Sequence, residues 1–325
     1  MKQTTITKIN SGQRADKFVR KWLGEAPLSF IYRLFRKKDV KVNGKWIPID
    51  HTLQEGEIVT IYVTDAQMDE FNKPKPIVPT PFPHQIVYED VVCLIVNKPK
   101  GLLVHGDETE KRLTLANQVL AYMMHSGIDI NNEGYCPAPA HRLDRNTSGL
   151  VIFGKTLAAQ QSFETLFHDR DQIEKHYLAL VKGVISKSGK IESYLHKDAE
   201  KNIVRVTKNK QQGQKAITNY EVRQVLDGYT LLDVLIETGR THQIRVQLAD
   251  IDHPLVGDRK YGDFKVNKLM SDKFDYEHQF LHAYKIVFKD LTGPIAHLSG
   301  RTFQAPLPLK EHAIINALAQ QSEGA

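Results

Sequence analysis

Residues 141–150 read His-Arg-Leu-Asp-Arg-Asn-Thr-Ser-Gly-Leu, and the apolar run Leu150-Val-Ile-Phe153 follows directly. The apolar run predicts a buried strand, so the polar segment before it predicts a loop where that strand begins. Active-site residues often lie on loops at strand ends. An isolated Arg-x-Asp sequence is nevertheless more typical of a surface turn in which Asp144 accepts backbone hydrogen bonds. The rest of the chain has to decide between these two interpretations.

From residue 85 onward, many apolar runs typical of strands alternate with a smaller number of stretches typical of helices. Several strands follow one another directly, which favours antiparallel pairing over repeated strand–helix–strand crossovers. We therefore predict an α+β fold with a mixed or antiparallel sheet. The predicted strands are 86–88, 91–96, 150–153, 177–181, 216–222, 230–236 and 285–288, and the predicted helices are 115–125, 157–169, 241–250 and 309–320.

The composition excludes several classes of protein. With 41% hydrophobic and 25% charged residues, the 325-residue chain resembles an ordinary globular protein, and no apolar run approaches the roughly 20 residues of a membrane span. Two cysteines cannot build a disulfide framework, and neither zinc-site spacing nor a phosphate-binding Gly-Lys loop occurs. We therefore expect a cytoplasmic monomer with no metal, no small-molecule cofactor and no membrane partner.

Positive charge is concentrated at the beginning of the chain. Residues 1–64 contain twelve Lys and Arg against six Asp and Glu, so they carry a formal charge of +6, equal to that of the whole chain. Such a concentration favours binding of a polyanion, because phosphate contacts release counterions. A solvated basic surface without a partner is the alternative interpretation.

The same 64 residues predict a small folded module. Ser11 and Ser29 are candidate caps of two helices, Asn43-Gly44 predicts a hairpin turn, and residues 57–63 predict a closing strand. The segments around Gly12-x-Arg14-x-Asp16-x-Phe18 and Asn43-Gly44 resemble the S-four-type RNA-binding module, named after a ribosomal protein. The basic residues expected to contact RNA are Arg14, Arg33, Arg36, Lys37, Lys38 and Lys41.

Residues 65–84 contain five prolines, at positions 74, 76, 79, 81 and 83. Proline at this density disfavours both helix and sheet and leaves a semi-extended spacer. We therefore predict a basic module at 1–64, a linker at 65–84 and a larger domain at 85–325.

The loop at 141–150 resembles the signature loop of the RluA family of RNA pseudouridine synthases. Four more segments resemble that family's motifs and occur in the family's order. They are Val-Asn-Lys-Pro-Lys-Gly-Leu-Leu-Val-His at 96–105, Thr-Leu-x-Asn at 114–117, Lys-x-Tyr-x-Ala-x-Val at 175–181, and Gly-Arg-Thr-His-Gln-Ile-Arg at 239–245 followed by His253-Pro-x-x-Gly257-Asp258. The resemblance is greatest to the RluC-like branch, which modifies large-subunit ribosomal RNA.

The resemblance implies roles for four residues. Asp144 matches the family's catalytic aspartate, and Arg245 matches the cation that keeps this carboxylate ionised against desolvation. Tyr177 matches the active-site tyrosine, which stacks on the base and is a candidate acceptor of the C5 proton. Arg142 matches the residue that enters the space vacated when the target uridine is flipped out of its stack.

The expected partner is therefore RNA, most directly 23S ribosomal RNA or a large-subunit assembly intermediate. Transfer RNA is the alternative substrate for the same chemistry. A non-catalytic RNA-binding or ribosome-assembly factor is the alternative function, although a fixed negative charge at Asp144 would oppose phosphate binding in such a protein. His141, His242 and His282 are expected to order loops rather than to bind a metal, since none has a partner at ligand spacing.

Overall fold

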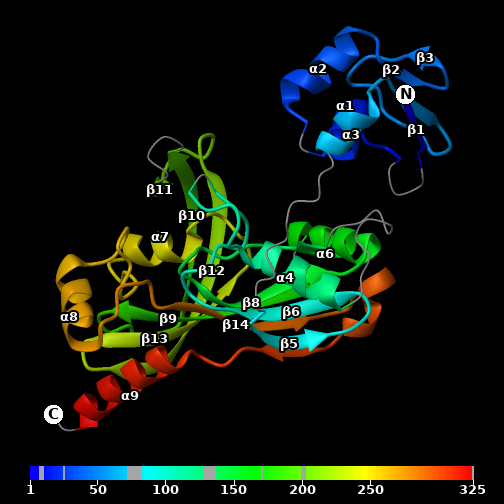
Figure 1. Cartoon of the computed structure of the whole chain (residues 1–325). Helices are drawn as coiled ribbons and strands as arrows, with labels where there is room; N and C mark the ends of the chain where they lie inside the picture. Colours follow the sequence, from blue (N-terminus) through cyan, green and yellow to red (C-terminus); the bar gives the residue numbers. More distant parts are fainter. Residues whose placement is uncertain are drawn as a thin grey trace. The chain divides into compact units, whose positions relative to one another are not determined.

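A computed structural model describes residues 1–6, 11–24, 26–71, 82–107, 109–126, 137–169, 171–198 and 203–323. The chain divides into two compact units, Met1–Val78 and Pro79–Ala325 (Figure 1). Within the described ranges, no helix is long and apolar enough to cross a membrane.

The N-terminal unit contains a four-stranded antiparallel sheet in the order β1-β4-β2-β3, together with three helices. Its core includes Val19 and Leu23 from the first helical segment, Ile31 and Leu34 from the second, and Val40 from the sheet, all of them buried. The elements are β1 (Lys2–Thr5), α1 (Ala15–Trp22), α2 (Leu28–Arg36), β2 (Val40–Val42), β3 (Lys45–Trp46), β4 (Ile58–Ile61) and α3 (Asp65–Phe71).

The two predicted helices of this unit form, but their predicted caps are wrong. Helix α1 begins at Ala15 with Arg14 as its N-cap residue, four residues beyond Ser11. Helix α2 begins at Leu28 with Pro27 as its N-cap residue, so Ser29 lies inside the first turn. Pro27 has φ −57° and ψ 142°, so its backbone is not helical and the helix begins at Leu28 without a side-chain cap hydrogen bond.

The predicted linker begins too early. Residues Asp65–Phe71 form α3, and Met68 and Phe71 pack against the core of the N-terminal unit. The Phe71 ring meets the Phe30 ring edge-on at 4.8 Å between centroids. The prolines that suggested a spacer all follow this helix, and those at 74–81 lie outside the described residues. The helix therefore belongs to the module that precedes it.

The larger unit is built on one mixed sheet, which confirms the α+β prediction. Eleven strands are described, nine of them in the order β11-β10-β12-β13-β9-β14-β8-β6-β5, with β15 beside β14 and β7 beside β8. The strands are β5 (Gln85–Glu89), β6 (Cys93–Lys98), β7 (Ala138–Pro139), β8 (Ser148–Gly154), β9 (Ile173–Lys182), β10 (Gly189–Asp198), β11 (Ile203–Thr207), β12 (Gln214–Leu226), β13 (Tyr229–Ile236), β14 (Leu281–Phe288) and β15 (Thr302–Gln304). The helices are α4 (Leu115–His125), α6 (Leu157–Asp169), α7 (Gln243–Asp250), α8 (Phe264–Phe274), the 3-10 helix η1 (Gly293–Leu298) and α9 (Leu309–Glu323).

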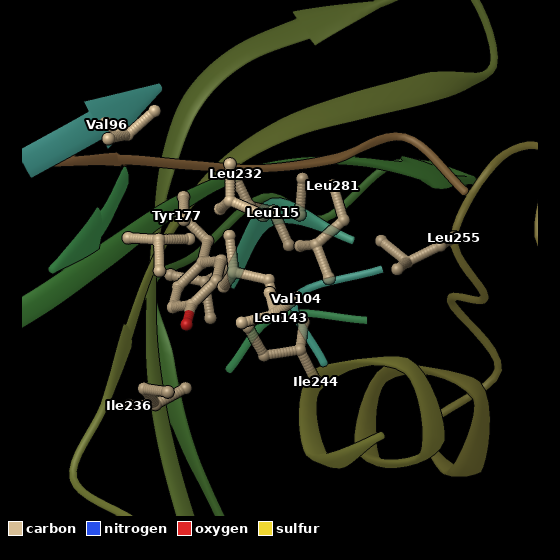
Figure 2. Packing of buried hydrophobic residues seen from close by; sticks show 14 of the residues in the cluster. Val96, Val104, Leu115, Leu143, Tyr177, Leu232, Ile236, Ile244, Leu255 and Leu281 are labelled. Carbon is tan, nitrogen blue, oxygen red and sulfur yellow. The ribbon is translucent and has the colours of Figure 1, made fainter. Parts of the chain in front are cut away.

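Helices cover both faces of this sheet. On one face, α4 and α7 contribute to a cluster that includes Tyr177 and Ala179 of β9, and Figure 2 shows part of it. On the other face, alternate residues of the same strand, Leu178 and Leu180, pack in a cluster shared with α8 and α9. A third cluster joins α6 and η1 to β8. Because side chains alternate along a strand, β9 is buried on both faces and holds Tyr177 firmly in place.

The hairpin of β10 and β11 and the helix α8 were not predicted from the sequence. Strand β10 reads Gly-Lys-Ile-Glu-Ser-Tyr-Leu-His-Lys-Asp, and only Leu195 in it is buried. Helix α8 likewise buries only Met270. Each element thus buries a single side chain, and neither contains the run of apolar residues on which the predictions relied.

The signature loop runs into β8 at the point where the sheet changes direction. Strand β8 pairs with β6 in the antiparallel sense and with β14 in the parallel sense, with Ala283 opposite Gly149. Gly149 has φ +117°, and a Cβ atom there would lie 2.2 Å from the Ala283 carbonyl oxygen. Glycine is therefore required both by the backbone conformation and by the close approach of β14.

Gly149→Ala should lower the free energy of unfolding by roughly 2–5 kcal/mol, through backbone strain and overpacking together. Gly300→Ala is the matched control, because Gly300 also has positive φ but a Cβ there would meet nothing within 4 Å. Urea unfolding of both variants measures the difference. Equal losses in the two variants would show that the contact with β14 is not the constraint.

Candidate active site

A cavity of about 370 Å³ opens beside the signature loop. The loop before β8, the strand β9, the loop after β13 and the first turn of α7 form most of its walls, and α6, β10 and β14 contribute single residues. Its lining residues include Arg142, Asp144, Thr147, Lys175, Tyr177, Lys197, Arg240, His242 and Arg245. Segments about 100 residues apart in the sequence therefore meet here, as the resemblance implied.

The guanidinium of Arg245 joins two carboxylates. Its Nη1 donates to Asp144 Oδ2 at 2.9 Å, while Nε and Nη2 donate to the two oxygens of Asp258 at 2.7 and 2.9 Å. The Arg245 and Asp258 side chains are buried, whereas that of Asp144 is one quarter exposed. The fork-shaped contact with Asp258 fixes the plane of the guanidinium, so Arg245 presents its remaining edge to Asp144.

The charge state of this triad follows from its contacts. Burial alone would raise the pKa of Asp258, but the hydrogen bonds and charge of Arg245, together with two backbone N–H groups, lower that pKa below its ordinary value. Burial also opposes the charge on Arg245, yet Asp258 and then Asp144 raise the pKa of Arg245 above its already high value. Arg245 therefore remains a cation beside Asp144.

A buried lysine anchors the signature loop. The Lys98 side chain is completely buried at the end of β6, and its Nζ donates to the carbonyl oxygens of Pro99, Leu102 and Arg145 at 2.9–3.0 Å. Burial lowers the pKa of Lys98 to about 7, while the nearby charge of Asp144 acts in the opposite direction. Three carbonyl acceptors match the three N–H donors of an ammonium group. Lys98 thus ties the residue after Asp144 to the turn that follows β6.

Two histidines order the ends of the same loop. His282 Nδ1 lies 2.9 Å from the Ser148 hydroxyl, and its Nε2 lies 3.2 Å from the Ala305 carbonyl oxygen. His141 Nε2 accepts a hydrogen bond from the Ile152 N–H, and burial lowers the pKa of His141 to about 3. Both rings therefore hold the loop through hydrogen bonds. In the described part of the chain, no group of three or more His, Cys, Asp or Glu side chains could hold a metal ion.

Tyr177 forms part of the apolar wall of the cavity. Its side chain is 7% exposed and packs in the cluster that includes Leu143 and Ile236. Figure 2 shows its hydroxyl pointing to the side on which these two residues lie. An aromatic ring held in this way can stack on a planar base that enters the cavity.

Comparison with known proteins assigns the chain to a family. Residues 92–250 match the family model described as RNA pseudouridylate synthase. The "Ribosomal large subunit pseudouridine synthase C" of Vibrio cholerae is 31% identical over 315 residues, which cover 93% of this chain and 91% of that protein. The chain belongs to the RluA family of RNA pseudouridine synthases. The "Ribosomal large subunit pseudouridine synthase D" of Yersinia pestis is 32% identical, and the match covers 98% and 95% of the two chains.

Solved structures support the fold of this pseudouridine synthase. Human RNA Pseudouridylate Synthase Domain Containing 4 aligns with a TM-score of 0.57 and 24% identity over 72% of this chain and 92% of that chain. Human RNA Pseudouridylate Synthase Domain Containing 1 aligns with a TM-score of 0.51 and 22% identity over 75% and 96% of the two chains. At these identities the likeness concerns the fold alone.

The synthase brings together the four residues for which the resemblance implied roles. Asp144, Tyr177, Arg245 and Arg142 all line the cavity, and Arg142 is exposed at its surface. The sequence analysis missed the part played by Asp258, the residue that fixes Arg245. The motif at 253–258 contained this aspartate, but nothing in the sequence indicated that it would meet an arginine 13 residues earlier.

The six basic residues predicted to contact RNA belong to the N-terminal unit, whereas the residues that line the cavity belong to the larger unit. Arg14 pairs with Asp16 at 3.0 Å, and Arg33 lies over the Phe30 ring. Lys38 and Lys41 lie over the rings of Trp46 and Tyr62, both of which are exposed. Arg36 and Lys37 are exposed at the end of α2.

Asp258→Asn should lower the free energy of unfolding by roughly 3–5 kcal/mol at neutral pH, because it leaves the buried Arg245 without its main partner. The pKa of Asp258 in the folded protein lies below its ordinary value of about 4, so this stabilisation is present above that pH and lost as the pH falls further. The difference between wild type and variant should therefore narrow in acid. Urea unfolding at several pH values measures it.

Asp252→Asn is the control for this prediction. Asp252 is exposed and has positive φ, a conformation that asparagine tolerates well. The free energy of unfolding of the Asp252→Asn variant should stay close to that of wild type. If the two variants behaved alike, the ion pair between Arg245 and Asp258 would not be a main support of the site.

Proposed function

We propose that this synthase isomerises uridine in RNA with the Asp144 carboxylate acting on the sugar and base of a flipped nucleotide. The observation that carries the proposal is the contact between Asp144 and the Arg245 cation at the wall of a cavity that also contains Tyr177. The polar contacts between Asp144 and the described side chains are to its Oδ2 atom. The Oδ1 atom is therefore the oxygen that we assign to the reaction.

The reaction needs few groups. The N1–C1′ glycosidic bond of uridine breaks, the uracil rotates, a C5–C1′ bond forms, C5 gives up its proton to an acceptor, and N1 gains a proton. A carboxylate near the sugar and base, an acceptor for the C5 proton and a site that excludes water are sufficient, and no electron transfer occurs. Asp144 supplies the carboxylate, whether it attacks C1′, adds to C6 or removes a sugar proton.

Tyr177 and Arg142 are assigned to the base and to the RNA. A phenol has an ordinary pKa near 10, so Tyr177 needs a charged neighbour or a relay if its hydroxyl accepts the C5 proton. Its ring supplies a stacking surface for the uracil. A nucleotide must leave its stack to reach such a cavity, at a cost of a few kcal/mol. Arg142, exposed at the cavity, can stack in the vacated place and contact phosphate.

Asp144→Asn should abolish pseudouridine formation while RNA affinity stays within a few fold of wild type. The amide retains the size of the side chain but cannot act as a nucleophile or a base. Formation of pseudouridine is measured in transcribed RNA, and binding is measured by titration of the same RNA. Substantial turnover by the verified variant would contradict the proposed role of Asp144, and loss of binding instead of turnover would favour a non-catalytic RNA-binding factor.

We propose large-subunit ribosomal RNA, either free or in an assembly intermediate, as the substrate. The names of the Vibrio cholerae and Yersinia pestis relatives support this choice, since the similarity extends over nearly the whole of both chains. Transfer RNA remains the alternative. We propose that the protein acts as a monomer in the cytoplasm. Mapping pseudouridines in cellular RNA with and without the gene tests the substrate.

We propose further that the N-terminal unit captures RNA. Two of its cations lie beside exposed rings, with Lys38 over Trp46 and the half-buried Lys41 over Tyr62. Such pairs suit RNA, because the cations meet phosphates while the rings stack on unpaired bases. The charge of +6 on residues 1–64 supports the same assignment.

The full-length variant in which Arg33, Arg36 and Lys37 are all changed to Gln should bind RNA more weakly. The slope of log K against log salt should fall by about 2–3, since each lost phosphate contact removes about 0.7–0.9. The control is a variant in which Lys265, Lys268 and Lys273 of α8 are changed to Gln, which removes the same charge elsewhere. Equal slopes for the two variants would mean that the N-terminal charge is a solvated surface.

A further inference from the structure

His242 stands beside Asp144 in an unusual backbone conformation. It is the N-cap residue of α7 and has φ 55° and ψ 21°, in the left-handed region that non-glycine residues rarely occupy. Its ring is 13% exposed, and its Nε2 lies 3.9 Å from Asp144 Oδ2. The same Oδ2 atom accepts the hydrogen bond from Arg245. The N-terminal end of α7 therefore brings two nitrogen-bearing side chains, those of His242 and Arg245, to one oxygen of Asp144.

The other ring nitrogen of His242 has a defined partner. Nδ1 lies 2.8 Å from the Tyr261 hydroxyl oxygen, and that oxygen accepts a hydrogen bond from the backbone N–H of Val204 at 3.0 Å. The Tyr261 ring also lies against the Arg245 guanidinium, 5.2 Å from its carbon. Val204 belongs to β11, so a chain of contacts runs from the β10–β11 hairpin through Tyr261 and His242 to Asp144.

We assign one tautomer to His242 from these contacts. Burial lowers the pKa of His242 to about 4, against the effect of Asp144, so the ring is neutral at physiological pH and carries one N–H. Burial also raises the pKa of Tyr261, which keeps its phenol protonated. With Val204 donating to the phenol oxygen, the Tyr261 O–H is free to donate to Nδ1. The ring proton then lies on Nε2, facing the negative charge of Asp144 rather than turning a lone pair toward it.

We propose that His242 is a positioning residue for Asp144. Its Nε2–H closes onto the Asp144 carboxylate in the working complex and holds it together with Arg245, while Tyr261 fixes the ring in the required tautomer. The inference rests on the proposed role of Asp144. It adds a reason for the left-handed conformation at residue 242, because strain of this kind persists only where the surroundings hold the residue in place.

The β10–β11 hairpin gives this relay a link to the substrate. Lys197 near the end of β10 lines the cavity and is exposed, so the hairpin forms part of the wall that RNA meets. Leu195 and Val204 of the hairpin pack with Val246 of α7, and Tyr261 packs against the same cluster. Figure 1 shows α7 beside these strands. Hairpin and relay are thus one packed unit, and the position of the hairpin is transmitted to His242.

Three substitutions of His242 separate its N–H group from its bulk. Glutamine places an amide nitrogen as many bonds from Cα as Nε2, whereas asparagine places one at the distance of Nδ1, and alanine places none. His242→Asn tolerates the left-handed conformation and can still meet Tyr261, but it cannot reach Asp144. We expect kcat to fall about 100-fold in His242→Asn and His242→Ala, the order of loss that a 1 Å misplacement produces. His242→Gln should recover most of the rate, with KM for the RNA unchanged throughout.

Tyr261→Phe tests the second link. It keeps the ring that lies against Arg245 and removes only the hydroxyl. In the wild-type background we expect kcat to fall about tenfold, the order of loss that follows removal of a residue that orients a functional side chain by a hydrogen bond. In the His242→Ala background, adding Tyr261→Phe should not lower kcat further. Single-turnover rates at saturating RNA, with thermal melting of each variant, provide the measurements.

The outcomes are separable. A His242→Asn variant with wild-type kcat, or equal losses in His242→Gln and His242→Asn, would overturn the proposal, as would additive effects of the Tyr261 and His242 substitutions. Turnover by Asp144→Asn would instead overturn the proposed function itself. If Asp144→Asn is inactive while His242→Asn retains full activity, Asp144 keeps its role and the positioning inference fails.

Discussion

The arrangement around Asp144 depends on one guanidinium that serves two carboxylates. Asp258, fully buried, takes two of the donors of Arg245 and orients the group, and Asp144 receives a third. If only one carboxylate were present, the cation could swing toward it and leave the cavity wall. Because Asp258 orients Arg245, Asp144 stays partly exposed at the cavity while the guanidinium that balances its charge stays buried. A buried ion pair of this kind contributes less to net stability than to geometry, because desolvation offsets much of its attraction.

The signature loop is held in place by residues of the neighbouring strands. Lys98 binds a carbonyl oxygen of the loop, His282 meets Ser148, and the missing side chain of Gly149 lets β14 approach. These contacts come from β6 and β14, two of the strands that pair with β8 in the sheet. Asp144 is therefore positioned by the sheet through the loop and by α7 through Arg245. A rigid scaffold on two sides is what a carboxylate needs when its reaction requires accurate placement.

Sequence analysis succeeded where an element buries several apolar side chains and failed where it buries only one. The strand that carries Tyr177, the strand that follows the signature loop, and the helices α4, α6, α7 and α9 were predicted with small errors at their ends. The hairpin of β10 and β11 escaped because polar side chains occupy most of its positions. Family motifs placed Asp144, Arg245, Tyr177 and Arg142 at one cavity, yet they could not pair Arg245 with Asp258. That pairing depends on how the chain returns after α7, which no local pattern encodes.

Charge shows the same limit in a different way. Beyond residue 64 the chain is formally neutral, which at first assigns RNA attraction to the N-terminal unit alone. The fold nevertheless gathers Arg142, Lys175, Lys197, Arg240 and Arg245 around one cavity, with Asp144 as the only acidic residue in its lining among the described residues. Net charge counts residues along the chain, whereas the potential that RNA meets depends on where they lie in space. The capture of RNA that we propose for the N-terminal unit and the attraction of RNA to this cationic cavity would therefore be separate contributions, and the first could weaken without loss of the second.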